Sequence, residues 1–203
     1  MPAKLGGKKG LSIIQYPHPT LRHTSKPLRR VDAELHRAVR EMFDLMYEAN
    51  GVGLAANQVD LPYRFFVMNL EADSKATDQE LVFLNPVLTA RKGTVEGEEG
   101  CLSLPGLYGQ VKRTERIVLN AYTLDGQEIT LDLDSLAARA VQHEIDHLDG
   151  VLFIDRLSLT GQLESQDTLH DMEREFLARR ERGEIPPDDQ IARRLAELER
   201  ERT

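Results

Sequence analysis

The chain has 203 residues, of which 40% are hydrophobic and 30% are charged, and its formal net charge is −8. This length favours one domain, or one domain with an appendage, and the composition is that of an ordinary globular protein. The acidic balance argues against a nucleic-acid-binding protein, no apolar run approaches the roughly 18 residues of a membrane helix, and a single cysteine excludes an internal disulfide.

The N-terminal segment, residues 1–10, is predicted to be a basic, flexible tail. It lacks the apolar stretch of a secretory signal. Residues 1–30 carry seven basic side chains and no acidic ones, which we interpret as a solvated basic surface. We therefore expect a cytoplasmic protein with no membrane contact and no specific nucleic-acid site.

Hydrophobic spacing predicts the elements of the first half of the chain. Apolar residues recur at helical intervals after Asp32, a suitable N-cap, so a helix is predicted over 32–49. Residues 51–58, GVGLAANQ, are too rich in glycine and alanine for a strand, and we interpret them as a loop that brings backbone close to another group. Strand-like apolar runs follow at 64–70 and 81–90.

A hairpin is the clearest pattern in the second half. Two alternating runs within 116–133 flank Asp125-Gly126, a dipeptide that favours a two-residue type I′ turn. Strands and hairpins around one central helix predict an α+β fold, with small antiparallel or mixed sheets and a C-terminal helix. The remaining predictions are a short strand at 93–98, a short strand or extended tail at 151–157, and helices at about 135–148, 162–182 and 189–202.

The central helix carries the motif His143-Glu144-Ile145-Asp146-His147. Histidines four positions apart project from the same helix face, so both imidazoles can bind one metal ion. Glu144 stands next to the first histidine, where it can reach a metal-activated water without binding the metal. Asp146 is expected to orient the helix or a neighbour by hydrogen bonding. The alternative interpretation is that the two histidines lie on an exposed helix and bind no metal, because the same sequence pattern also occurs by chance.

A catalytic metal site usually has three protein ligands, and two candidates for the third are open. Glu164 follows the motif at a distance that a thermolysin-type zinc peptidase allows. Cys101, in EGEEGCLSLPG, would offer a thiolate beside the flexible Gly100, and a Cys-His-His set suits both Fe(II) and Zn(II). A structural metal site or a peptide-binding module without catalysis is the other class of interpretation.

Three segments together resemble the peptide deformylase family, in the family's order and spacing. The resemblance implies a hydrolase that removes the formyl group from the N-terminal formylmethionine of new polypeptides and releases formate. It extends over residues 11–160, which we predict to be the catalytic domain, followed by a charged helical extension at 161–203. The three segments are Gly51-Val52-Gly53-Leu54-Ala55-Ala56-Asn57-Gln58, Glu99-Gly100-Cys101-Leu102-Ser103 and His143-Glu144-Ile145-Asp146-His147-Leu148-Asp149-Gly150.

The resemblance also implies residue roles. The metal ligands would be Cys101, His143 and His147, with Fe(II) as the natural metal and zinc, nickel or cobalt as alternatives in preparations. Metal-bound hydroxide would attack the formyl carbon, with Glu144 as general base and acid. The Gln58 side-chain amide and the Leu102 backbone N–H would hold the oxyanion. Substrate would contact Gly51, Val52, Gly53, Tyr108, Leu136, Arg139 and Ala140.

The chain departs from the family pattern at Tyr108. The sequence also does not decide whether the C-terminal segment contacts the ribosome. Many members carry an arginine that contacts the substrate backbone where this chain has Tyr108. Formylmethionyl nascent peptides are the implied substrates, and C-terminal helices in the family can dock on the ribosome. Residues 161–203, however, carry eight arginines against twelve acidic residues, so we favour a helix that packs back on the core.

Overall fold

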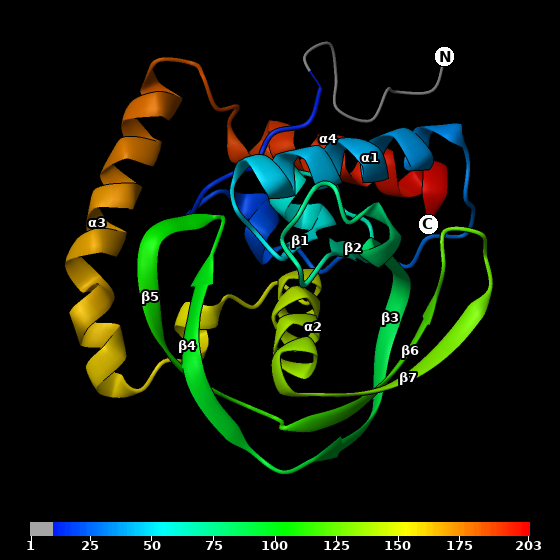
Figure 1. Ribbon diagram of the computed structural model, residues 1–203. Helices are drawn as coiled ribbons and strands as arrows, with labels where there is room; N and C mark the ends of the chain where they lie inside the picture. Colours follow the sequence, from blue (N-terminus) through cyan, green and yellow to red (C-terminus); the bar gives the residue numbers. More distant parts are fainter. Residues whose placement is uncertain (1–9) are drawn as a thin grey trace.

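A computed structural model describes residues 10–203. A five-stranded antiparallel sheet and a two-stranded antiparallel sheet flank one central helix, α2 (Figure 1). The predicted α+β class is therefore confirmed. The predicted basic tail lies, except for Gly10, outside the described residues. No helix within 10–203 is long and apolar enough to cross a bilayer.

The larger sheet has the strand order β1-β2-β3-β6-β7, and β4 pairs with β5 in the smaller one. Consequently β1 lies at an edge of the large sheet, and β4 has one edge at which the described residues place no strand. The helices are α1 (Ala33–Glu48), α2 (Ser135–Leu148), α3 (Leu159–Glu181) and α4 (Asp188–Arg202). The strands are β1 (Gly53–Ala55), β2 (Phe65–Met68), β3 (Leu81–Lys92), β4 (Val95–Cys101), β5 (Leu104–Arg113), β6 (Arg116–Tyr122) and β7 (Glu128–Asp134).

The large sheet is buried on both faces where it meets the helices. Phe65 and Val67 of β2 pack into a core with α1, whereas Phe66 and Met68 pack into a second core with α2. This double burial explains why the segment is apolar at every position instead of alternating. The predicted helix at 32–49 is confirmed as α1, and the Asp32 side chain caps it by accepting hydrogen bonds from two backbone N–H groups.

The interpretation of 51–58 as a loop was wrong. Gly53–Ala55 is strand β1, antiparallel to β2, and Ala56–Val59 is a buried 3-10 turn. Small residues have little strand propensity, so the strand conformation here depends on pairing with β2 and on burial beneath α1 and α2.

Three further expectations differ from the structure. Leu104–Arg113, which no prediction covered, is the long strand β5. The segment predicted as a short strand or extended tail at 151–157 contains instead a 3-10 turn at Phe153–Arg156. The hairpin turn is not type I′: Thr123 and Gln127 are hydrogen-bonded, and only Gly126 has a positive φ, 78°. A longer turn that ends in a left-handed glycine is the usual alternative to the two-residue turn.

The C-terminal helix is part of the main core. Leu198 of α4 packs with the α1 core, and its carbonyl accepts a hydrogen bond from the Tyr63 hydroxyl. The Arg202 side chain, 1% exposed, donates to Asp32 at 2.9 Å and also to Glu34. The favoured prediction that the C-terminal segment packs back on the core therefore holds for α4, whereas α3 lies along the outer side of β5 (Figure 1).

Replacing Arg202 with alanine is expected to lower the free energy of unfolding by about 2 kcal/mol, because hydrogen bonds to charged groups contribute about 1.5–3 kcal/mol. Burial opposes ionisation of Asp32, but Arg202 and the backbone N–H groups of Leu35 and Glu34 together outweigh it and hold the pKa of that carboxyl below its usual value. The stabilisation by this pair is therefore full above about pH 4 and decreases as the pH falls further.

Urea denaturation as a function of pH measures this effect. The difference between the wild type and R202A should be largest at neutral pH and should shrink below about pH 4. The matched control is R200A on the same helix, an exposed arginine, which should change stability by less than about 0.5 kcal/mol. An R202A protein as stable as R200A would contradict the structural role of the pair.

Candidate active site

A cleft of about 700 Å³ opens between α2, the chain around β1 and the β4–β5 hairpin. It collects residues from all three sequence segments of the resemblance. His147, only 1% exposed, lies behind the cleft wall. Every other predicted site residue lines the cleft, namely Gly51, Val52, Gly53, Gln58, Cys101, Leu102, Tyr108, Leu136, Arg139, Ala140, His143 and Glu144.

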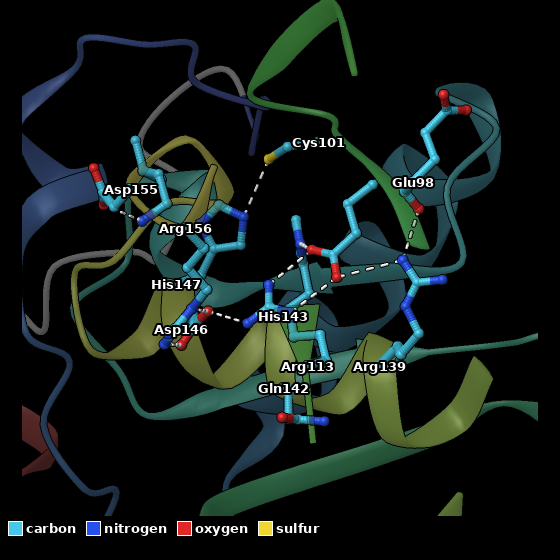
Figure 2. A network of polar contacts seen from close by, with 12 residues as sticks. Glu98, Cys101, Arg113, Arg139, Gln142, His143, Asp146, His147, Asp155 and Arg156 are labelled. Carbon is cyan, nitrogen blue, oxygen red and sulfur yellow. Dashed lines mark hydrogen bonds and ion pairs between the residues drawn. The ribbon is translucent and has the colours of Figure 1, made fainter. Parts of the chain in front are cut away.

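The structure brings Cys101, His143 and His147 together. One ligand atom from each lies within 4.8 Å of the others, and Cys101 Sγ is 3.1 Å from His147 Nε2 (Figure 2). Cys101 ends β4, and the two histidines are one turn apart on α2, so the group joins the small sheet to the central helix. Glu164, the alternative candidate for the third ligand, is exposed on α3 and does not belong to this group.

The donor atoms present fit a divalent transition metal. His143 Nδ1 is 3.0 Å from Glu99 Oε2, which leaves Nε2 as the ligand atom of this ring. His147 directs Nε2 towards the thiol, while its buried Nδ1 has no partner among the described residues. One thiolate and two imidazoles form a three-ligand set, and Cys101 and His143 also line the open cleft, from which a fourth ligand can enter.

The two histidines differ in their affinity for a proton. Burial favours neutral His143, but hydrogen bonds with Cys101 and Glu99 outweigh it and raise its pKa to about 10. Burial lowers the pKa of His147 well below its usual value, and the nearby charge of His143 adds to this. Because metal binding requires neutral imidazoles, metal uptake should release a proton from the site.

Glu144 is buried beside the ligand group, 4% exposed. Burial is the main cause that raises the pKa of this carboxyl to about 7. Its Oε2 has no hydrogen-bond partner among residues 10–203. A Cβ at Gly53 would lie 2.5 Å from Glu144 Oε1, so only glycine leaves room for the carboxylate at this point of β1. A carboxyl with a pKa near neutrality can both accept and donate a proton.

The Gln58 side chain is held in one orientation. Its Oε1 accepts a hydrogen bond from the Ala55 backbone N–H at 2.9 Å, so its amide N–H₂ must point the other way. That group donates to Ser103 Oγ at 3.1 Å and lies 3.5 Å from Cys101 Sγ. The amide donor is thus directed at the ligand group. Leu102 also lines the cleft, and its side chain packs against Gly51.

A buried network of charges, which the sequence did not predict, connects the two halves of the site. Arg113 of β5 donates to Glu99 of β4 at 2.7 Å and also to Asp146 of α2, which in turn accepts from Arg156 (Figure 2). The partners expected for Asp146 are therefore two arginines. Burial opposes the charged form of Glu99, but hydrogen bonds with Arg113 and His143 hold its pKa at about 2. The network fixes the cysteine-bearing hairpin against the histidine-bearing helix.

Replacing Arg113 with methionine is expected to destabilise the fold by about 3 kcal/mol, because it removes one partner of a buried ion pair. Metal affinity should fall about 10- to 100-fold, since Glu99 then no longer holds His143 in place. Thermal unfolding and titration with a metal-chelator buffer measure the two effects. As a control, R116M removes a surface pair with Asp132 and should cost no more than about 1 kcal/mol, with metal affinity unchanged.

The fold and the cleft define a class of protein. A helix-borne His-Glu-x-x-His pair with a cysteine beside it, open to a peptide-sized cleft, is the arrangement of a metal-dependent hydrolase. Residues 11–162 match the family model described as polypeptide deformylase. The chain is 48% identical over 189 residues to the peptide deformylase of Rhodopirellula baltica, covering 93% of this chain and 94% of that one.

Other relatives and solved structures agree. The peptide deformylase of Neisseria gonorrhoeae is 45% identical over 152 residues, covering 75% of this chain and 89% of that one. A Plasmodium falciparum peptide deformylase structure superposes with a TM-score of 0.80 at 35% identity, covering 82% of this chain and 98% of that chain. A plant peptide deformylase structure superposes with a TM-score of 0.82 at 34% identity, covering 91% of this chain and 98% of that chain. This chain belongs to the peptide deformylase family.

Proposed function

We propose that this chain removes the formyl group from the N-terminal formylmethionine of newly made polypeptides, with release of formate. The observation that carries the proposal is the position of Glu144 beside the group formed by Cys101, His143 and His147. Its carboxyl is buried, and Oε2 has no partner in the described part of the chain. Hydrolysis of an amide needs a water nucleophile, a base for its proton and donors for the oxyanion. The cleft has a candidate for each.

Cys101, His143 and His147 would hold one divalent ion, which we propose to be Fe(II) in the cell, with zinc, nickel or cobalt able to replace it. The bound ion would acidify a water molecule and polarise the formyl carbonyl. Thiolate and imidazole ligands accommodate these metals alike. The buried network around Glu99 would keep the His143 ring in the orientation for binding.

The residues of the chain then handle protons and charge. Glu144 takes the proton of the attacking water and later gives it to the amine nitrogen as the carbon–nitrogen bond breaks. The Gln58 amide and the Leu102 backbone N–H donate to the oxygen that becomes negative on the formyl carbon. One such donor contributes roughly 2.7–4 kcal/mol to transition-state stabilisation.

The peptide itself would lie extended between β1 and the free edge of β4. Gly51 and Gly53 bring backbone close to the cleft on one side, and β4 offers unpaired backbone groups on the other. The first side chain would rest on α2 beside His143. Its surroundings are proposed to be Val52, Leu136, Arg139 and Ala140, with Tyr108 near the entrance.

Formate release from a formyl-methionyl tripeptide tests the proposal. Protein purified without oxygen and analysed for metal should release formate and a free amine in equal amounts, and the internal peptide bonds should stay intact. Oxygen sensitivity that follows the iron content would support Fe(II). Cleavage of an internal peptide bond without formate would instead show a peptidase and refute the proposal.

We also propose that the enzyme acts in the cytoplasm, with residues 161–203 as a structural extension of catalytic residues 11–160. Because α4 belongs to the core, any transient contact with the ribosome would use the outward face of α3. That face exposes Leu159, Leu163 and Leu177. Co-sedimentation of a variant with these three leucines changed to serine tests the contact, and undiminished binding would exclude α3.

A further inference from the structure

The cleft wall beside His143 carries a charged side chain. Arg139 lies on α2 one turn before His143 and reaches across to β4, where Nη2 donates to the Glu98 carbonyl oxygen at 2.7 Å (Figure 2). The same nitrogen lies 3.6 Å from Glu99 Oε1. The Arg139 side chain is only 19% exposed, so it closes this end of the cleft instead of extending into solvent.

Gly97 provides the space for this guanidinium. A Cβ at Gly97 would lie 2.1 Å from Arg139 Nη1 and 2.6 Å from Cζ. Any other residue at position 97 would therefore displace the arginine from β4. Gly97 and Arg139 therefore depend on each other: because Gly97 has no side chain, the long side chain of Arg139 can reach from α2 to β4.

The guanidinium has more donors than partners. Arginine carries five N–H groups, but the hydrogen bond to Glu98 uses only one of them. Nε is buried without a partner among the described residues. Glu99 forms an ion pair with Nη2, but at 3.6 Å it lies beyond hydrogen-bond distance, and Nη1 has no partner among residues 10–203. This wall of the cleft therefore has apolar methylenes along the arginine stem and spare donors at its end.

We propose that Arg139 lets the pocket for the first side chain accept methionine sulfoxide as well as methionine, because its spare N–H groups meet the sulfoxide oxygen. The inference rests on the proposed function, which places the first side chain of a formylated peptide on α2 beside His143. A thioether is only a weak acceptor, so it gains little from the donors and packs on the arginine stem. An apolar wall would leave a sulfoxide oxygen unpaired and would disfavour it roughly 10- to 100-fold.

Three formyl tripeptides that differ only in the first residue test the proposal: methionine, norleucine and methionine sulfoxide. Norleucine has the shape of methionine without its sulfur, so the ratio of kcat/KM for the sulfoxide to that for norleucine reports the polar end of the pocket. The wild-type ratio should be above 0.1. In R139M, which keeps an apolar stem and loses the donors, the ratio should fall at least tenfold, because only the sulfoxide loses a hydrogen-bond partner.

Two further variants distinguish donors from general disturbance. R139K keeps a charged donor and should show a smaller fall than R139M. L136A, on the same face of α2, should change both substrates alike and leave the ratio unaltered. A wild-type ratio below 0.1 would overturn the proposal without any variant, as would an R139M ratio equal to that of the wild type or an equal fall in L136A. Failure to release formate from the methionine peptide would refute the proposed function instead.

Discussion

Glu144→Gln is expected to reduce formate release by about 10²- to 10⁴-fold, the usual contribution of a general acid–base residue. The amide keeps the shape of the side chain but cannot take the proton of the attacking water or return it to the amine. Because the three ligand donors do not include Glu144, the variant should retain its metal. The measurement is formate release under anaerobic conditions, with the metal content determined on the same sample.

The matched control is Glu128→Gln on β7, an exposed carboxylate outside the cleft lining, which should leave turnover unchanged. Loss of metal from the Glu144 variant would mean that the glutamate supports the ligand group instead of the proton transfer. Turnover equal to the wild type would exclude the proposed role altogether.

Cys101→Ala is expected to prevent stoichiometric metal binding and with it formate release. The change leaves two imidazoles, and two ligands do not complete a site that usually has three from the protein. The fold should persist, since Cys101 is only partly buried and the Arg113 network still fixes β4 and β5 to α2. Metal analysis after dialysis tests the loss of metal, circular dichroism tests whether the fold persists, and the formate assay tests the loss of activity.

Glu164→Gln is the natural comparison for this variant, because Glu164 was the competing third ligand. Its position on the exposed face of α3 leads us to expect full metal content and full activity. If Cys101→Ala kept its metal while Glu164→Gln lost it, the ligand group proposed here would be incorrect and the peptidase interpretation would return.

The sequence predicted a helix over about 135–148, which is confirmed as α2, because its apolar spacing and the Asp149-Gly150 end are local signals. Two of the three proposed ligands follow from helix geometry alone, since histidines four positions apart share a face. Cys101 needed the resemblance in addition, because a lone cysteine in a glycine-rich strand has no local pattern that separates a ligand from an inert thiol.

What the sequence did not predict depends on contacts between distant segments. β5 contains Pro105 and two glycines, and its strand conformation depends on pairing with β4. Because β5 was missed, so was Arg113, whose pairing with Asp146 spans 33 positions. The same holds for Gly97 and Arg139: no spacing rule relates a glycine on a strand to an arginine on a helix, and only the tertiary structure shows that one makes room for the other.

The free edges of β1 and β4 have a consequence for the range of proteins that the enzyme can process. An edge strand recognises a partner through main-chain N–H and C=O groups, which nearly all amino acids share. If a peptide binds along these edges, only its first side chain would contact a specific pocket, on α2. The rest of the peptide would be bound through main-chain hydrogen bonds alone. Binding beyond the first residue would be largely sequence-blind, as a single enzyme needs to be if it is to process the many different N-termini of a proteome.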